Sequence, residues 1–353
     1  MNYEIIKLFK QLAEIDSPSG EEGNVSKFVF DFLTDIGFKP EKLTAGMIYC
    51  QTSTNAPRKL FCAHMDTVEP GRGIEVIEKN GYIQSKGNTV LGADNKVAVA
   101  AILFALKQHK LANTMPDIEL LFTVREETDS GIQQIPKGLI KSKTGFVFDL
   151  KDGLNEVALS EPYISDFVIK IYGKASHAAR PEDGINALEI LLGTKEELSL
   201  GRLGSETTFN IGIINGGDAT NTVPGTLTLK GDIRSSDKNT FYTHQTKVEE
   251  IFNKCALTKG GKVSVEWIPY SFGYTHNLQG TAYNKIENIY TELDLKLDPI
   301  KSTGGSDAGF LNHIGIETFN LGYGVENIHT TEERIEIAKF IKLAQIVQFM
   351  MSE

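Results

Sequence analysis

The sequence predicts an α/β protein whose main domain is interrupted by a smaller α+β domain. At 353 residues, the chain is longer than a single hydrophobic core usually supports, which favours two domains. Short apolar runs alternate with longer helical patterns up to about residue 160, as is typical of an α/β domain. The pattern then changes to half-exposed strands, and the first pattern returns after about residue 275. We therefore predict a main domain of residues 1–163 and 273–353, with an insertion of residues 164–272.

The main domain is expected to begin with an amphipathic helix, because apolar residues recur at helical spacing in the first fifteen residues. A second helix, at 95–110, is apolar on nearly all sides and should be buried. A closing helix is predicted from Thr330 to about residue 350, with Thr330 and Glu333 as its capping box. Strands are predicted at short apolar runs, namely 59–64, 118–124, 145–149 and 317–322.

The insertion should contain a strand, a helix, two strands, a helix and a strand, in that order. The first helix is predicted at 181–198, and the strands are predicted at 164–173, 209–216, 226–234 and 262–267. An insertion of this length has a normal size for a domain.

Composition excludes several classes of function. A net charge of −10 argues against a nucleic-acid surface, and no apolar run is long enough to span a bilayer. The N-terminal stretch is amphipathic and does not resemble a signal peptide. The three cysteines form an odd set without paired spacing, which is typical of reduced thiols. We therefore expect a cytoplasmic protein with neither nucleic acid nor membrane as a partner.

Groups that bind metals follow the predicted strands of the main domain or open its buried helix. Ligands of open α/β sheets collect outside the carboxyl ends of the strands, so these groups should meet at one edge. They are His64, Asp66, Asp94, Glu126, Glu127, Asp149 and His329.

Five carboxylates and two imidazoles in one place need a counter-charge. Buried charges are paired or coordinate metals, and no Lys or Arg cluster of matching size is present, although Lys96 and Arg125 are near in sequence. Mixed imidazole and carboxylate ligands suit Zn²⁺, with Co²⁺ or Mn²⁺ as alternatives. The ligands are too many for one tetrahedral ion, so two ions that share a bridging carboxylate are expected.

The adjacent glutamates at 126 and 127 are expected to have different roles. If they continue the strand, their side chains point to opposite faces, so one can bind metal while the other accepts a proton. The spacing of His64 and Asp66 lets the aspartate hold the imidazole tautomer. Each signal alone has a simpler interpretation: a solvated strand end for the glutamates, a helix N-terminal residue for Asp94 and a turn residue for Asp149.

Essentially the whole chain resembles the co-catalytic zinc exopeptidases and amidohydrolases, the family of peptidase T, carboxypeptidase G, succinyl-diaminopimelate desuccinylase and aminoacylase. The similar motifs are HMDTV (64–68), GADNKVAVAA (92–101) and REETDSG (125–131). The resemblance implies a zinc-peptidase catalytic domain with a mixed sheet between helices. It also implies that Glu126 is the general base and that Asp66 orients His64. One zinc would be held by His64, Asp94 and Asp149, and the other by Asp94, Glu127 and His329.

The insertion resembles the lid or dimerisation domain of that family, through GKASHAARPEDGINAL (173–188) and NTVPGTLTLKGDIRS (221–235). The resemblance implies a homodimer formed through the insertion. His177 would supply a proton donor or an oxyanion contact, sometimes to the neighbouring subunit, and Asn221 and Arg234 would meet a carboxylate or carbonyl of the peptide. A glycine-rich loop, STGGSDAGF (302–310), would line the substrate site with Gly304 and Gly305.

The resemblance is closest to the peptidase T-like tripeptide aminopeptidases. Asn95 and Ala98 depart from the residues of many relatives, but neither is a ligand in the implied scheme. Asp149 tilts the expectation toward an aminopeptidase, because carboxypeptidases and deacylases of the family tend to have Glu there. We expect release of the N-terminal residue from short peptides. The alternatives are a deacylase of N-acyl amino acids, a carboxypeptidase-type exopeptidase, or a binding protein that has lost the chemistry.

Overall fold

The computed structural model describes residues 2–53, 59–151 and 153–352, and the chain divides into two units. The first unit ends at Glu161 and resumes at Thr275, and the second is Pro162–Tyr274. Each unit has its own buried apolar cluster. None of the helices in the described ranges has both the length and the apolar character needed to cross a membrane.

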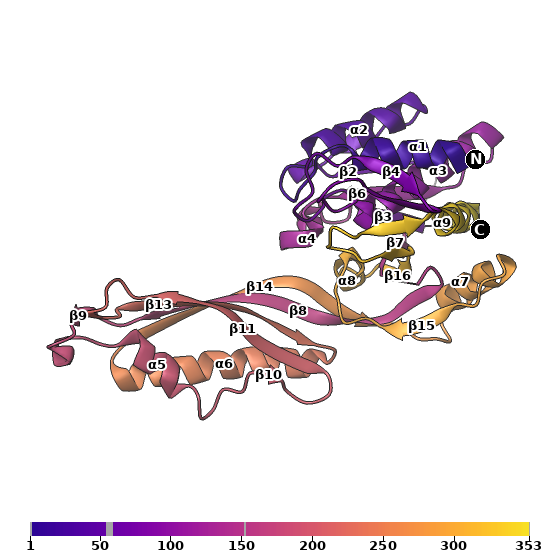
Figure 1. Cartoon of the computed structure of the whole chain (residues 1–353). Coiled ribbons are helices and arrows are strands. Elements are labelled where there is room, and N and C mark those ends of the chain that lie inside the picture. The colour runs from indigo at the N-terminus through magenta and orange to yellow at the C-terminus, as the bar shows by residue number, and fades with distance from the viewer. Residues whose placement is uncertain (1, 54–58, 152, 353) are drawn as a thin grey trace. The chain divides into compact units, whose positions relative to one another are not determined.

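The first unit is built on a mixed sheet (Figure 1). Its inner strands β6, β3, β7 and β16 are parallel, whereas β1 and β2 are antiparallel at one end. At the other end, β16 pairs with the first part of β8, which also pairs with β15. In sheet order the bounds are β1 Glu41–Lys42, β2 Ile48–Gln51, β6 Ile118–Thr123, β3 Lys59–His64, β7 Thr144–Leu150, β16 Glu317–Gly322, β8 Glu156–Tyr172 and β15 Asp298–Lys301.

A smaller antiparallel sheet in the same unit carries the last loop before the C-terminal helix. Its order is β17 (Val325–Glu326), β18 (Arg334–Glu336), β5 (Tyr82–Ser85) and β4 (Val76–Lys79). The loop between β17 and β18 contains His329.

Helices cover both faces of the larger sheet. On one face α3 contacts β3 and β7 and packs against α1 and α9. Successive strand residues point to opposite faces. Phe61 and Ala63 of β3 belong to the core that includes α3, while the Cys62 thiol faces Asp307 of α8, so α8 covers the other face. The helix bounds are α1 Asn2–Ala13, α2 Gly23–Asp35, α3 Ala93–Ala112, α4 Glu126–Asp129, α7 Thr281–Glu292, α8 Asp307–His313 and α9 Ile337–Ser352, with 3-10 turns at Thr44–Gly46 and Gly131–Gln134.

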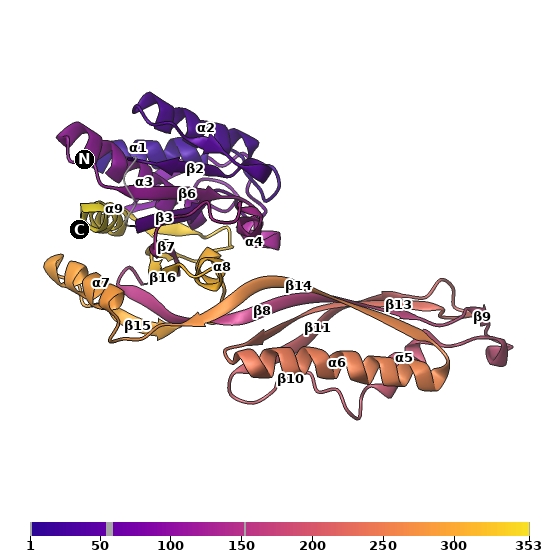
Figure 2. The ribbon, with the colours of Figure 1, turned by 180° about the vertical axis from the view of Figure 1, so that it is seen from behind.

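The second unit is an antiparallel sheet with helices α5 and α6 along one face, as Figure 2 shows from behind. The rest of β8 pairs with β13, β13 with β11 and β11 with β10, while β14 joins the other side of β8. A separate pair, β9 with β12, lies outside this sheet. The bounds are β9 Ser176–His177, β10 Gly201–Arg202, β11 Thr207–Gly216, β12 Thr222–Val223, β13 Thr226–Ser235, β14 Lys262–Thr275, α5 Ala187–Gly193 and α6 Lys238–Lys259, with a 3-10 turn at Pro181–Asp183.

Three local predictions were wrong. The first helix of the insertion is shorter than 181–198, because Pro181–Asp183 forms a separate 3-10 turn and Asn186 caps α5. The first strand of the insertion was predicted to begin at residue 164, whereas β8 begins at Glu156. The closing helix begins at Ile337, and Thr330 and Glu333 form no capping box, because β18 lies between them and α9.

Candidate metal centre

The carboxyl edge of the parallel strands brings the predicted ligands together. His64 is the last residue of β3, and Asp149 is the last residue but one of β7. Asp94 lies in the first turn of α3, the two glutamates begin α4, and His329 comes from the loop between β17 and β18. The fold therefore collects at one edge residues that are far apart in the sequence.

Asp94 stands between the two imidazoles. Its Oδ1 lies 3.3 Å from Nε2 of His64, and its Oδ2 lies 3.2 Å from Nε2 of His329. One carboxylate thus presents a separate oxygen to each histidine.

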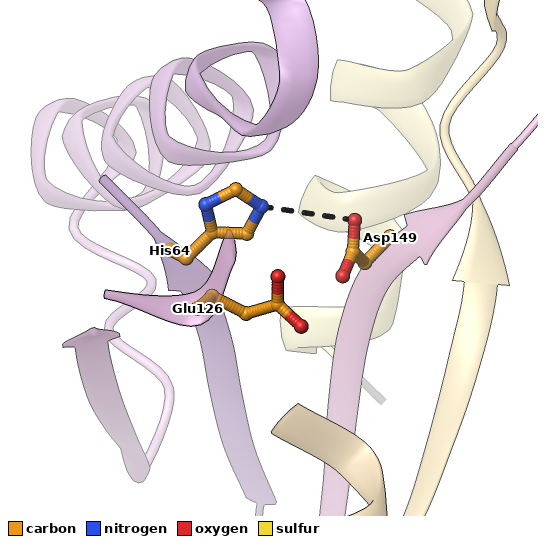
Figure 3. A group of neighbouring side chains, drawn as sticks. All are labelled: His64, Glu126 and Asp149. Carbon is orange, nitrogen blue, oxygen red and sulfur yellow. Dashed lines mark ion pairs between the residues drawn. The ribbon is translucent and has the colours of Figure 1, made fainter. Parts of the chain in front are cut away.

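The two ring nitrogens of His64 face different partners. Nδ1 lies 3.3 Å from Oδ1 of Asp66 and 3.1 Å from the backbone oxygen of Asp66. Nε2 faces Asp94 and lies 3.8 Å from Oδ1 of Asp149, the pair marked in Figure 3. Contact with an acceptor at Nδ1 leaves Nε2 as the nitrogen that can bind metal.

Glu126 and Glu127 differ in surroundings, but not for the predicted reason. They follow β6 in the short helix α4, so the argument from strand alternation was wrong. The carboxylate of Glu126 points toward His64 and Asp149 (Figure 3), whereas Oε1 of Glu127 lies 2.9 Å from Nε2 of His329. Both backbone N–H groups donate to Asp66, at 3.1 Å each.

Two groups of ligand atoms are close enough to hold an ion. The ligand atoms of His64, Asp94 and Glu127 lie within 4.8 Å of one another, and so do those of His64, Glu126 and Asp149. These groups differ from the two sets that the resemblance implies. Distance alone allows Glu126 to act either as a ligand or as a base, so its role needs a chemical test.

Crowding shifts the proton affinities of the site. Burial raises the pKa of Glu126 well above its usual value, and the Asp149 carboxylate raises it further. Burial and then Asp94 raise the pKa values of Asp149 and Glu127. Hydrogen bonds to Asp94 and Glu127 raise the pKa of His329 to about 10. Burial lowers the pKa of His64, but Asp149, Asp66 and Asp94 together raise it well above its usual range.

The donor set suits divalent cations. In the part of the chain that the structure describes, Asp94, Glu127 and Asp149 form ion pairs with imidazoles and none with Lys or Arg. Their oxygens and the imidazole nitrogens converge at distances that a shared cation can span. Candidate ligands are therefore present, and a cation would replace the protons that the crowded groups otherwise hold.

The glycine-rich loop is anchored to the Asp149 side of the centre. Glu161, which is buried, accepts the N–H and the hydroxyl of Ser306 at 3.2 and 2.7 Å and the side-chain amide of Asn320 at 2.8 Å. Asn320 accepts the N–H of Asp149 at 2.9 Å. Gly304 lies in this loop and bonds through its backbone to Ser302. Gly305, beside Ser306, is partly buried.

Two further buried carboxylates were not predicted as parts of the site. Asp307 accepts the hydroxyl of Thr123 under the carboxyl edge, and burial raises its pKa to about 6. It belongs to the motif STGGSDAGF, which could have drawn attention to it. Glu333 accepts three backbone N–H groups from residues 91–94. Its spacing to Thr330 in the sequence was interpreted as a helix capping box.

The remaining predicted residues lie in the second unit and do not form one group. His177 on β9 is exposed and sits beside Asn221, whose backbone oxygen accepts the N–H of Ala178 at 2.8 Å. Arg234 lies at the far end of β13 from this pair and bonds to Asp232 at 2.8 Å. Because a strand rises about 3.3 Å per residue, the eight steps from Thr226 to Arg234 span about 26 Å.

Comparisons with known proteins agree with this fold. A family model described as "Peptidase family M20/M25/M40" matches residues 60–353. The crystal structure of aminopeptidase PepT from Bacillus cereus is similar at 30% identity, with a TM-score of 0.87, over 100% of this chain and 98% of that one. A tripeptidase from Staphylococcus aureus gives 30% identity and a TM-score of 0.90 over the same shares. The uncharacterized protein YqjE of Bacillus subtilis is 29% identical over 99% of this chain and 98% of its own. The predicted α/β fold is thereby confirmed.

Metal should stabilise the protein more at high pH than at low pH. In the metal-free chain the raised pKa values of His64, His329 and Asp149 keep protons on groups that must lose them to bind an ion. At one fixed concentration, a hundred times the dissociation constant at pH 8, Zn²⁺ or Mn²⁺ should add about 2.7 kcal/mol per ion to the free energy of unfolding at pH 8 and less at pH 6, where the dissociation constant is larger. We expect the rise in melting temperature to grow from pH 6 to pH 8. A monovalent salt is the control, and a rise that does not depend on pH would contradict the expectation.

Proposed function

Because the chain belongs to the peptidase family M20/M25/M40, we propose that it is a di-zinc aminopeptidase that removes the N-terminal residue of short peptides. The membership makes the chain a peptidase-family protein with hydrolase chemistry. Beyond this membership, we propose the number of metal ions, their identity and the direction of cleavage.

One observation carries the proposal of two ions. Asp94 offers one oxygen to the side of His64 and the other to the side of His329. Asp149 completes the first side and Glu127 the second. We propose His64, Asp94 and Asp149 as the ligands of one ion and Asp94, Glu127 and His329 as the ligands of the other. Zn²⁺ suits these donors, and Co²⁺ or Mn²⁺ could replace it.

When bound, the two ions would polarise the scissile carbonyl and lower the pKa of the attacking water. Glu126 accepts the proton of that water and transfers it to the leaving amine. Its position beside His64 and Asp149, and the raised pKa that burial gives it, suit a group that must take up and then release a proton. Asp66 holds His64 and the backbone of both glutamates in place.

Support for a peptide substrate comes from the solved structures at 30% identity, which are those of an aminopeptidase and a tripeptidase. Asp149 also supports an aminopeptidase, by analogy, because carboxypeptidases and deacylases of the family tend to have Glu at this position. Among the proposed substrate contacts, His177 and Asn221 lie side by side, whereas Arg234 lies near the far end of β13. Gly304 and Gly305 are proposed to line the substrate site. We propose a cytoplasmic location because all three cysteines are free thiols.

The cleavage direction is tested by the products of a defined substrate panel. We expect tripeptides to yield their free N-terminal residue and a dipeptide in the presence of Zn²⁺, Co²⁺ or Mn²⁺, as measured by mass spectrometry. Release of the C-terminal residue would instead identify a carboxypeptidase. Release of acetate or succinate from N-acyl amino acids would identify a deacylase, which could use the same metal centre.

Replacement of Glu126 or Glu127 by its amide should impair different properties of the enzyme, namely turnover for the first and metal affinity for the second. Glu126→Gln should retain both metals and lower turnover about 10²- to 10⁴-fold, because proton transfer is lost. Glu127→Gln should weaken one metal site, because an amide oxygen is a poorer zinc ligand than a carboxylate, and excess metal should restore part of the activity. The measurement is metal content and turnover of both variants across a zinc titration.

Each glutamate variant is the control for the other, since the two changes are chemically identical and adjacent. Equal metal loss in both would make Glu126 a ligand, in agreement with its place within 4.8 Å of His64 and Asp149. Near-normal turnover of Glu126→Gln would remove it from the proton transfer altogether.

We also propose that the second unit mediates a homodimer. The outer edge of β11 pairs with β10 at Thr208 and Phe209 alone, and no other described strand continues that pairing to Gly216. Ile213 and Ile214, on this stretch, have exposed fractions of 57% and 61%. An open strand edge with exposed apolar side chains is a surface that another strand can extend.

Charges on the β11 edge should separate the dimer. Wild-type protein is expected to show twice the mass of one chain by light scattering at micromolar concentration, and Ile213→Lys with Ile214→Lys should show the mass of one chain, because lysines disfavour edge pairing. The control is Leu111→Lys, an apolar residue at the end of α3 in the first unit that is even more exposed, at 70%. A single-chain mass for the wild-type protein would contradict the proposed dimer.

A further inference from the structure

Glu333 is a buried carboxylate that contacts the backbone at the start of α3. Its Oε2 accepts the N–H groups of Leu91 and Gly92 at 2.7 and 2.8 Å, and its Oε1 accepts the N–H of Asp94 at 2.8 Å. The residue is 2% exposed. Three hydrogen bonds thus join one side chain to a segment about 240 residues away in the sequence.

The start of α3 lacks a cap of its own. Gly92, the residue before the helix, has a left-handed backbone with φ of 68° and makes no side-chain capping bond. The first N–H groups of a helix have no partner within the helix and need an outside acceptor. Glu333 accepts one of these groups, the N–H of Asp94, together with the N–H groups of Leu91 and Gly92 that precede the helix. It is delivered by the loop between β17 and β18.

This loop also carries His329, four residues before Glu333. The His329 side chain is 46% exposed, so burial does not hold it in place. The bonds of Thr330 to Asn327 and Glu332 stay within the loop, and therefore shape the loop without fixing it to α3. The Glu333 carboxylate joins the segment that bears His329 to the segment that bears Asp94.

We propose that Glu333 is a positioning residue for the second metal site: by holding Leu91, Gly92 and Asp94, it sets the separation of Asp94 and His329. Nε2 of His329 and Oδ2 of Asp94 lie 3.2 Å apart in this arrangement. Glu333 belongs to neither group of converging ligand atoms, and its oxygens accept backbone N–H groups, so its role toward the ion is indirect. This inference rests on the proposed di-metal function and adds a determinant of the affinity of one of its two sites.

The test compares Glu333→Gln with Glu332→Gln and His329→Ala. An amide has one acceptor oxygen and a donor NH₂ group, so at least one of the three N–H groups loses its partner in Glu333→Gln. Glu332 is the matched control, because it is the neighbouring glutamate and is exposed. His329→Ala identifies the second site, since His329 is a proposed ligand of that ion alone. Dissociation constants for Zn²⁺ and Mn²⁺ are measured by calorimetry on the metal-free variants, and the visible absorption of bound Co²⁺ reports the geometry of each site.

Glu333→Gln should raise the dissociation constant of the second ion about 10- to 100-fold, the usual effect of removing a group that supports a ligand. The other ion should be affected less, and Glu332→Gln should bind both ions as the wild type does. Circular dichroism of the metal-free protein checks the fold. If Glu333→Gln does not fold, Glu333→Asp, which keeps the charge but is one methylene shorter, should show the same selective loss.

Wild-type affinity for both ions in a folded Glu333 variant would overturn the inference, and so would an equal loss at both sites, which indicates a general structural role. Either result leaves the proposed function intact, provided that His329→Ala loses one ion. If the wild-type chain binds no divalent ion, the proposed function fails, and this inference fails with it.

Discussion

The metal centre depends on the carboxylate of Asp66, which is fully buried and joins three segments of the chain. It faces Nδ1 of His64, accepts the N–H groups of Glu126 and Glu127, and accepts the hydroxyl of Ser19 at 2.6 Å. A buried carboxylate is costly unless its oxygens are hydrogen-bonded. Because these donors come from different segments, the requirement to satisfy one charge holds β3, α4 and the N-terminal region in a single arrangement. These interactions lower the pKa of Asp66 despite its burial, so the group is ionised as its partners require.

A carboxylate from a distant segment also holds the start of two other helices of the first unit, α3 and α8. α3 begins after Gly92 and α4 after Arg125, both left-handed, and neither helix has a side-chain cap from its own segment. Glu333 supplies the acceptor for α3, and Asp66 does so for α4. α8 does have its own cap, Ser306, but Glu161 holds that serine. Each helix that carries or borders the site is therefore fixed at its start by a carboxylate from a distant segment. The N–H groups at the start of a helix need acceptors from outside the helix. The same hydrogen bonds therefore satisfy these N–H groups and hold the candidate ligands in place.

This dependence on distant partners explains what the sequence could and could not predict. The strands that carry His64 and Asp149 at or near their carboxyl ends were predictable, because a buried parallel strand is a short apolar run and its carboxyl end is a known ligand position. The turn after β6 was not, because the left-handed Arg125 that ends the extended run leaves no periodic signal. The partners of Glu333 lie about 240 residues away, so its spacing to Thr330 was interpreted as a local cap. A local sequence pattern indicates which chemical groups a residue offers, whereas the tertiary fold determines which other groups it contacts.

Two kinds of carboxylate can be separated by what their oxygens contact. Asp66, Glu161 and Glu333 accept N–H or O–H groups of the chain, and Asp66 also faces Nδ1 of His64, the nitrogen that points away from the candidate ligands. Burial lowers the pKa of Lys96, in α3, to about 7, although the charges of Asp16, Glu333 and Asp66 raise it. Asp94, Glu127 and Asp149 instead pair with imidazoles, which can balance them by holding protons. A divalent ion would therefore compete with the imidazole protons for the second kind. Because the supporting carboxylates contact backbone N–H and hydroxyl groups of the chain, they can hold the ligand side chains in position for an ion.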